Sequence, residues 1–400
     1  MTKTISARQL SLIAFISVFS LKLTVLPSLF YSKVGIDAIF SLFIIMAFDF
    51  LELLLIFHVL KKNQDISFYQ FLSNKVGKYF AKLILLLIFI YYFFKMLLLC
   101  SGGYNYASLA IFKEAPRHLF LFILLVSSCS LYLFKSRSYA RTIEFFYPIV
   151  ATMFVLFVGI ALFTAPLQDI RPLLTTPAQN IFESSFMFSV LGGNYLFMLL
   201  FMGKIKFGKN PNRTVFGHVV FAWALLMVFY IIDYSIFKYT AVAHPHAISE
   251  IIQYLPLPSI LGNFDWIAVS FMLVLFVLQG GLFIYCMCYS LNKVFEVKEV
   301  EKMGAVSKVV LVFVNLLLLL FIYVVFPTFS DLRTFAFNGL FVPILSSVVM
   351  LVPIICFFFE LFNNKKRTKV APSLKSTEEF VEAENQKILS LKVRKDEETI

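Results

Sequence analysis

The sequence predicts an all-α polytopic membrane protein in which ten transmembrane helices form two inverted repeats of five. Three observations support this prediction. Apolar segments long enough to cross a bilayer follow one another along most of the chain, and 60% of its residues are hydrophobic. Lysine and arginine gather in alternate loops between these segments. The first and sixth segments both contain helix-breaking or polar residues near the middle, as an inverted repeat requires.

Ten segments are expected to cross the lipid bilayer, because each can supply about 20 residues of helix at about 1.5 Å per residue. The fourth segment is only just long enough, and short polar loops separate all of them. In chain order the segments cover residues 9–31, 37–60, 80–103, 117–134, 143–165, 183–203, 215–238, 264–291, 306–326 and 336–361.

The loop charges predict that both termini are cytoplasmic in a multi-pass protein of a bacterial cytoplasmic membrane. Most basic residues lie in the N-terminus, in the loops after the even-numbered segments, such as Lys61 and Lys62, and at the start of the tail. The other loops hold few, and basic loops stay on the cytoplasmic side. Residues 1–362 are therefore interpreted as a transmembrane domain, and residues 363–400 as a charged cytoplasmic tail that is disordered or loosely helical.

Ten segments divide into repeats at about residues 9–165 and 183–361. Five segments enter the membrane on one side and leave on the other, so the second repeat must be inverted. Carriers built on this plan bind their solute near the membrane midplane, between broken helices. The plan predicts that the sixth segment is interrupted at the same place as the first.

The first segment carries Ser20, Lys22, Thr24 and Pro27. A lysine near the bilayer centre costs roughly 3 kcal/mol on insertion scales, and proline removes a backbone N–H donor. These residues favour a helix that lines a cavity and binds a ligand or ion through Ser20, Lys22 and Thr24. The alternative is a kinked helix whose lysine pairs with a neighbouring carboxylate.

The sixth segment carries Ser189, Gly192, Gly193 and Asn194 near its middle. Paired glycines weaken a helix by about 1 kcal/mol each relative to alanine and let a ligand approach the backbone. We therefore expect a second half of the substrate site here. Close packing of helices through small residues is the alternative.

Four ionisable residues inside the predicted segments form a candidate site for ion or proton coupling. Asp49 and Glu52 are three residues apart and share a helix face. Lys22, Asp49 and Lys95 fall at similar depths in their segments. The group is either a structural ion-pair network or a set in which one lysine titrates, as a proton-coupled carrier needs.

Other functional classes have little support. The sequence has no nucleophile–base arrangement, zinc-ligand spacing or dinucleotide fingerprint, so neither an enzyme nor a cofactor is expected. His244 and His246 in a long outer loop are weak evidence for a metal, and the five cysteines predict no metal site. The net charge of +12 lies in short loops beside apolar segments, so the expected partner is the lipid bilayer rather than nucleic acid.

Several stretches carry a resemblance to a known family over about residues 5–360. They read ISARQLSLIAF, LPSLFYSKVGIDAIFSLFI, VGKYFAKLILLLIFIYYFF, SRSYARTIEFFYPI and LGNFDWIAVSFMLVLFVLQGGLFIY. They resemble the spore-germination permease family, the GerAB-type B subunits of nutrient germinant receptors within the amino acid–polyamine–organocation superfamily. The resemblance implies a LeuT-type fold with helices one and six unwound around a small ligand, an amino acid. It also implies A and C receptor subunits as partners in the spore inner membrane.

The sequence departs from the family pattern at three places. Asn194 stands where many members have an acidic residue, and Ala115-Pro116 replaces a frequent Thr-Pro pair. Lys22 places a cation where many members have a small or apolar residue. Two functions therefore remain open. One is a sensor subunit of a germinant receptor, and the other is an autonomous proton-coupled amino-acid transporter.

Overall fold

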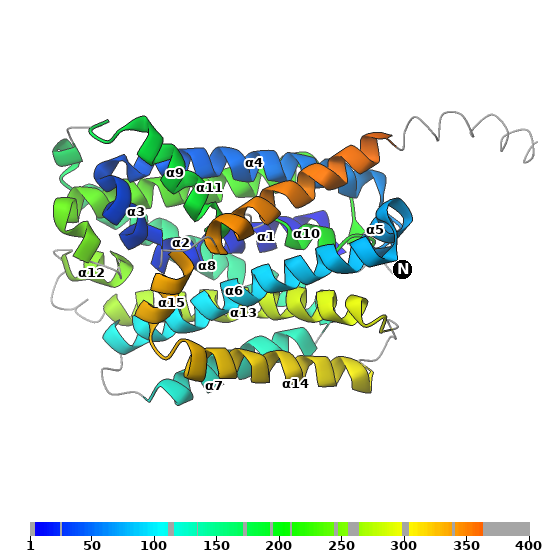
Figure 1. Ribbon diagram of the computed structural model, residues 1–400. Coiled ribbons are helices and arrows are strands. Elements are labelled where there is room, and N and C mark those ends of the chain that lie inside the picture. Colours follow the sequence, from blue (N-terminus) through cyan, green and yellow to red (C-terminus); the bar gives the residue numbers. More distant parts are fainter. Residues whose placement is uncertain are drawn as a thin grey trace, which may run out of the picture. The chain divides into compact units, whose positions relative to one another are not determined.

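The computed structural model describes residues 5–24, 26–110, 116–133, 135–170, 174–192, 195–208, 210–243, 247–254, 264–297, 304–337 and 341–362. These residues are almost entirely helical, as Figure 1 shows. The chain divides into two units, Met1–Pro353 and Ile354–Ile400. The boundary expected between residues 362 and 363 stays a prediction, because residues 363–400 lie outside the described residues.

The first half of the chain contains eight α-helices and two short 3₁₀-helices within the described residues. They are α1 (Ala7–Val18), α2 (Ser20–Thr24), α3 (Leu26–Val34), η1 (Gly35–Asp37), α4 (Ala38–Lys62), α5 (Phe68–Val76), α6 (Lys78–Ala110), α7 (Arg117–Leu133), α8 (Lys135–Thr164) and η2 (Leu167–Ile170).

The second half is more interrupted. Its helices are α9 (Ala178–Phe188), the 3₁₀-helix η3 (Ser189–Leu191), α10 (Phe197–Leu200), α11 (Pro211–Phe237), the 3₁₀-helix η4 (Lys238–Ala243), α12 (Ala247–Tyr254), α13 (Phe264–Val294), α14 (Ala305–Leu320), the π-helix η6 (Phe321–Val325), α15 (Phe329–Phe337) and a last helix at Phe341–Phe362.

The all-α membrane architecture agrees with the prediction. Each of the ten predicted segments contains helix, and eight helices of the described chain are long and apolar enough to cross a membrane. The fourth segment forms the 17-residue helix α7, and the sixth is split among α9, η3 and α10. Ten crossings and the inverted repeat stay predictions, because length and composition alone do not establish them.

Local sequence explains where several helices begin and end. Ser6 and Gln9 form a capping box at the start of α1, and Ser67 and Gln70 form another at the start of α5. Pro211 occupies the first turn of α11, where its missing N–H breaks no helical bond. These caps satisfy backbone groups that would otherwise be unpaired at the helix ends.

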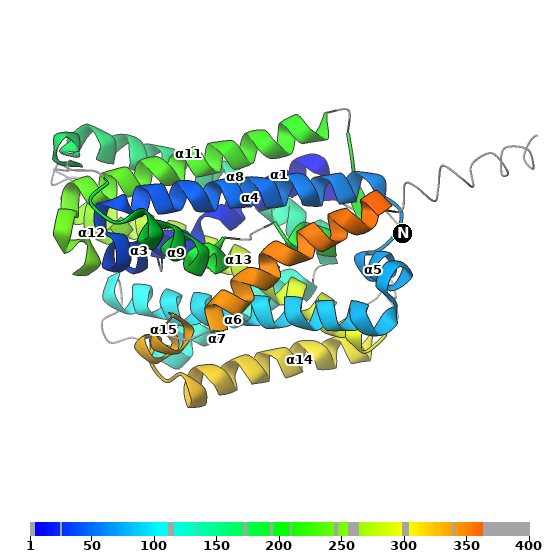
Figure 2. The same ribbon diagram turned by 45° about the horizontal axis from the view of Figure 1, so that its top comes forward.

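The short pieces of the first and sixth segments lie among the long helices, as Figures 1 and 2 show. Helix α1 packs against α11 and α8, while α2 contacts α6 and α13. Helix α10 contacts α4 and α13. Nearly every residue of α1 and α2 is buried. Helices α1, α2 and α10 therefore sit in the core of this unit, whereas α9 is partly exposed.

Two long-range contacts tie the halves of this unit together. Strand β1 (Ile5–Ser6) pairs in parallel with strand β2 (Ile205–Lys206), which joins the start of α1 to the residues after α10. At the start of α4, the Asp37 carboxylate accepts hydrogen bonds from the backbone N–H groups of Leu174 at 2.7 Å and Thr176 at 2.8 Å. The strand pair links the first segment to the end of the sixth, and the Asp37 contacts link the residues before α9 to the start of α4.

Candidate functional site

The first segment is broken into three helical pieces. Helix α1 ends at Val18, where Phe19 takes a non-helical ψ of −105°. The five-residue α2 follows, and α3 begins at Leu26. Pro27 lies in the first turn of α3, where its missing N–H costs no hydrogen bond. Proline thus helps to start α3, and the interruption precedes it in the chain.

The sixth segment is also broken. Helix α9 ends at Phe188, η3 covers the next three residues, and Gly192 leaves the helical region with ψ −142°. Gly193 and Asn194, both predicted at the site, lie outside the described residues. A Cβ atom on Gly192 would stand 2.8 Å from Asp49 Oδ1 and 2.9 Å from the Ser189 carbonyl. Only glycine therefore allows this close approach to α4.

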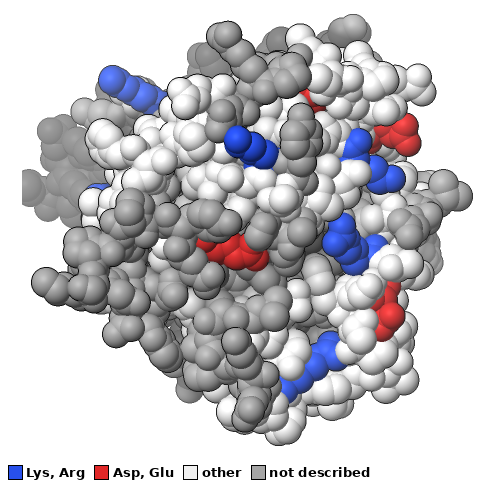
Figure 3. Space-filling view, turned by 90° about the vertical axis from the view of Figure 1, so that its left-hand side faces the viewer, with Lys and Arg blue, Asp and Glu red and all other residues white. Residues whose placement is uncertain are grey.

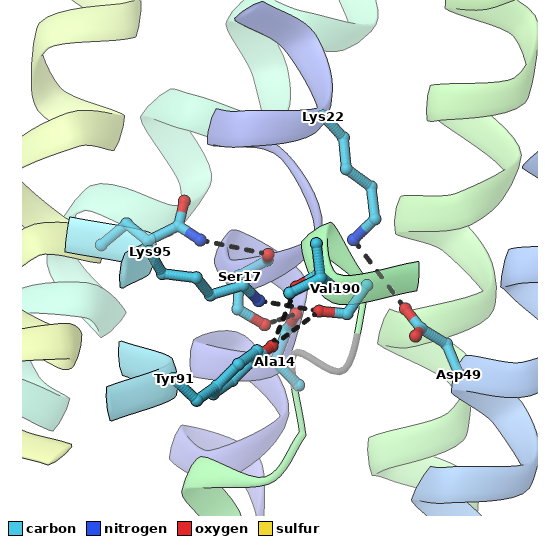
Figure 4. A network of polar contacts seen from close by, with 9 residues as sticks. Ala14, Ser17, Lys22, Asp49, Tyr91, Lys95 and Val190 are labelled. Carbon is cyan, nitrogen blue, oxygen red and sulfur yellow. Dashed lines mark hydrogen bonds and ion pairs between the residues drawn. The ribbon is translucent and has the colours of Figure 1, made fainter. Parts of the chain in front are cut away.

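Lys22 and Asp49 face each other in the core formed by the described helices. The Lys22 Nζ atom lies 3.8 Å from Asp49 Oδ2, and the exposed fractions of the two residues are 0% and 2%. Figure 4 shows the lysine of α2 pointing toward the carboxylate of α4. The ammonium also lies 4.9 Å from the centre of the Trp223 ring in α11. A buried ion pair at this separation gains attraction without a direct hydrogen bond.

Lys95 and Tyr91 of α6 contact the broken end of the sixth segment. The Lys95 ammonium donates to the Gly192 carbonyl at 2.7 Å. The Tyr91 hydroxyl lies 3.2 Å from the Val190 carbonyl and 3.1 Å from that of Gly192. Both side chains converge on this backbone in Figure 4. Carbonyls freed at a helix C-terminus carry partial negative charge, so a lysine here neutralises them.

The side chains predicted to bind a substrate differ in their capacity to do so. Thr24 donates to the Ser20 carbonyl at 3.1 Å, and Ser189 donates to the Phe186 carbonyl at 2.7 Å. Their single hydroxyl protons are therefore engaged within their own helices. By contrast, Ser20 Oγ, Lys22 Nζ and Glu52 Oε1 are buried and have no hydrogen-bond partner among the described residues.

The structure thus brings Lys22, Asp49, Glu52 and Lys95 to the two helix breaks, and it adds residues that sequence reasoning did not assign. Trp223 packs on the Lys22 ammonium, and the Tyr230 hydroxyl donates to the Lys22 carbonyl at 2.8 Å. Gln279 donates to the carbonyl of Ser17 near the end of α1 at 3.4 Å. In the sequence, these residues could have been found as a tryptophan and polar side chains that lie inside apolar segments.

The electrostatic balance of the cluster limits what it can bind. It contains two lysines and two carboxylates on the three helices α2, α4 and α6, and all four residues are at most 7% exposed. In their ionised forms these charges cancel, so a net-neutral guest enters without adding an uncompensated charge. Within the described residues, no group of three or more His, Cys, Asp or Glu side chains is placed to hold a metal ion.

Comparison with known proteins decides the family. The model of the spore germination protein family, a family of spore permeases, matches residues 4–317. The chain belongs to this family. The match covers all the residues of the candidate site and confirms the resemblance found in the sequence. A search of curated proteins finds no significant match. With its apolar helices, this membership makes the chain an integral membrane, permease-like protein of the spore germination system.

Proposed function

We propose that this protein binds a small solute, an amino acid, as the B subunit of a spore nutrient germinant receptor. In this proposal the chain crosses the spore inner membrane ten times with a LeuT-type arrangement of two inverted repeats. Both termini are cytoplasmic. Support comes from the family and from the interruptions in the first and sixth segments. The end of the helices that carries α12, the proposed outer end, shows only scattered charges in its described part (Figure 3).

One observation carries the proposal: two interrupted helices meet at a buried cluster that retains unused hydrogen-bonding capacity. The Lys22 ammonium has no hydrogen-bond acceptor, and Glu52 Oε1 has no donor, among the described residues. An amino acid brings a carboxylate and an ammonium group together with no net charge. Its carboxylate would bind Lys22, and its ammonium would bind Glu52 and the acidic side of the cluster.

Ser20 would add a side-chain hydrogen bond to the bound solute, because its hydroxyl is buried without a partner among the described residues. Thr24, Ser189, Gly192, Gly193 and Asn194 would complete the substrate site. Lys95, bound to the Gly192 carbonyl, would hold the sixth segment in its interrupted form. Ligand binding would then shift α2 and α9 and pass the change to A and C subunits.

The alternative function is an autonomous proton-coupled amino-acid transporter. The pairing of Lys22 with Asp49 deep among apolar helices favours it, since such lysine–carboxylate groups serve proton relays in carriers. In that case Lys22, Asp49, Glu52 and Lys95 would form the coupling site.

Amino-acid binding and uptake by proteoliposomes that contain only this protein test the proposal. Radiolabelled amino acids are supplied singly, with and without an inward proton gradient. The proposal predicts saturable binding without accumulation, because a sensor subunit does not need to move its ligand. Accumulation that requires the gradient would establish the transporter instead. Failure of every amino acid to bind would contradict the assigned ligand class.

A further inference from the structure

Asp233 is a buried carboxylate outside the cluster described above. It lies in α11, near the end that leads into η4, and only 1% of its surface is exposed. Neither carboxylate oxygen has a hydrogen-bond partner among the described residues. An ionised carboxylate in such a position has lost its hydration without replacement, which is one of the costliest arrangements in a protein interior.

Tyrosine rings surround this carboxylate. Tyr31 of α3 packs against Tyr230, with ring centroids 6.3 Å apart, and against Tyr234, with centroids 5.7 Å apart. All three tyrosines are at most 4% exposed. The Tyr31 hydroxyl lies within interaction range of the Asp233 carboxyl group. Aromatic rings therefore pack beside the site, and the Tyr31 hydroxyl is a polar group within its reach.

The directions of the hydroxyl protons decide what Asp233 can do. The Tyr31 hydroxyl donates to the Tyr230 carbonyl at 3.4 Å. The Tyr230 hydroxyl donates to the Lys22 carbonyl at 2.8 Å. A tyrosine has one O–H donor, so neither hydroxyl has a proton left for Asp233. Each oxygen can still accept, so a protonated Asp233 carboxyl group can donate to the Tyr31 hydroxyl oxygen within its range.

The charged groups nearby do not compensate a negative charge on Asp233. From α12, Glu250 brings a carboxyl group of like charge within electrostatic range. Lys238, which begins η4, is exposed at the surface. His244 and His246 lie outside the described residues. Lys22, Asp49 and Glu52 belong to the cluster described above, and the hydrogen bond of Tyr230 is to the Lys22 backbone carbonyl.

We propose that Asp233 is a proton-binding site, separate from the Lys22–Asp49 cluster, whose bound proton is donated to the Tyr31 hydroxyl. The proton comes from bulk water and converts the carboxylate to a neutral carboxylic acid. The chain of donors then runs from Asp233 to Tyr31, to the Tyr230 carbonyl, and on from the Tyr230 hydroxyl to the Lys22 carbonyl. Loss of the proton turns the Tyr31 hydroxyl toward the carboxylate and releases the Tyr230 carbonyl.

This arrangement couples a proton to the break in the first segment. Tyr31 belongs to α3, Lys22 belongs to α2, and Tyr230 bridges both from α11. Protonated Asp233 leaves the Tyr31 hydroxyl bonded to the Tyr230 carbonyl, whereas ionised Asp233 draws that hydroxyl away and breaks this bond between α3 and α11. The inference goes beyond the proposed ligand, because it concerns a proton site that needs no solute.

Infrared difference spectroscopy of the full-length protein in lipid nanodiscs tests the proposal. Spectra are recorded during a pH titration for the wild type, for Asp233→Asn and for Asp331→Asn, which alters an exposed carboxylate in α15. We expect a carboxylic-acid C=O band at neutral pH that shifts in D₂O, is lost in Asp233→Asn and persists in Asp331→Asn. An identical band in wild type and Asp233→Asn would overturn the proposal.

A second variant keeps the test decisive if Asp233→Asn does not fold. Tyr31→Phe retains the carboxyl group but removes the oxygen that accepts its proton, so the C=O band should move to higher frequency. A band at unchanged frequency would contradict the assigned acceptor. The hydrogen-exchange rate of residues 20–34 is measured for the wild type and Asp233→Asn at the same series of pH values. The rate should decrease more steeply with falling pH in the wild type than in the variant. Equal pH dependence would refute the coupling to the first segment.

Discussion

Replacement of Lys95 by methionine is the most informative perturbation of the helix break in the sixth segment. Methionine keeps the length and apolar stem of lysine and removes only the charge and its donors. The Lys95 side chain is 1% exposed and bonds the Gly192 carbonyl at 2.7 Å. A hydrogen bond from a charged group contributes about 1.5–3 kcal/mol.

The full cost of Lys95→Met should exceed that of one hydrogen bond. Lys95 also interacts electrostatically with Asp49 and Glu52, so its removal leaves two carboxylates opposite the single cation of Lys22. Removal of one partner from a buried ionic group costs about 3–5 kcal/mol. We therefore expect the variant to lose about 3–5 kcal/mol of stability. Where this loss destabilises the conformation that binds the ligand, each 1.4 kcal/mol lowers the ligand affinity about tenfold.

Lys82→Met is the matched control, because Lys82 lies in the same helix and also has an ionic partner. Its ammonium is 2.8 Å from Glu296, but the side chains are 30% and 55% exposed to solvent. Exposed pairs of this kind contribute little. Thermal unfolding in nanodiscs and amino-acid binding are measured for both variants. Equal behaviour of Lys95→Met and Lys82→Met would refute the view that Lys95 holds the break.

Three further variants test contacts around the site. Gly192→Ala places a Cβ 2.8 Å from Asp49 Oδ1 and 2.9 Å from a backbone oxygen. Overpacking should therefore lower the free energy of unfolding by about 1–3 kcal/mol, measured by thermal unfolding. A variant as stable as the wild type would contradict the close approach. Asp37→Ala removes the acceptor of two backbone N–H groups, so the free energy of unfolding should fall by about 2–4 kcal/mol. An unchanged midpoint of thermal unfolding would contradict this. Tyr230→Phe leaves the buried Lys22 carbonyl without this donor, so hydrogen exchange of α2 should increase; unchanged exchange would show that the contact does not hold α2.

The interruptions of the first and sixth segments were predictable because their causes are local. Glycine, proline, serine and lysine within an apolar run weaken a helix wherever the run lies in the fold. The position of the first break was harder to predict. Pro27 is the strongest helix breaker in the first segment, yet it fits the first turn of α3. The backbone leaves the helical conformation earlier, at Phe19. A favourable helix start and a helix break look alike in sequence.

The partners of the buried charges depend on packing and were only partly predictable. Similar depth in the predicted segments placed Lys22, Asp49 and Lys95 at one level. It did not indicate that Lys95 binds the Gly192 carbonyl, because this contact depends on where the sixth segment unwinds. The described side-chain contacts at this break are made to freed backbone carbonyls. Asp233 had no visible partner in the sequence.

Equilibrium binding of amino acids to the purified protein in nanodiscs tests the central claim most directly. Binding is compared among the wild type, Lys22→Ala and Lys33→Ala; Lys33 is an exposed lysine at the end of α3. The account predicts that the wild type and Lys33→Ala bind the same amino acid with equal affinity, while Lys22→Ala loses at least tenfold. Equal affinity in all three proteins would remove the buried cluster from ligand recognition.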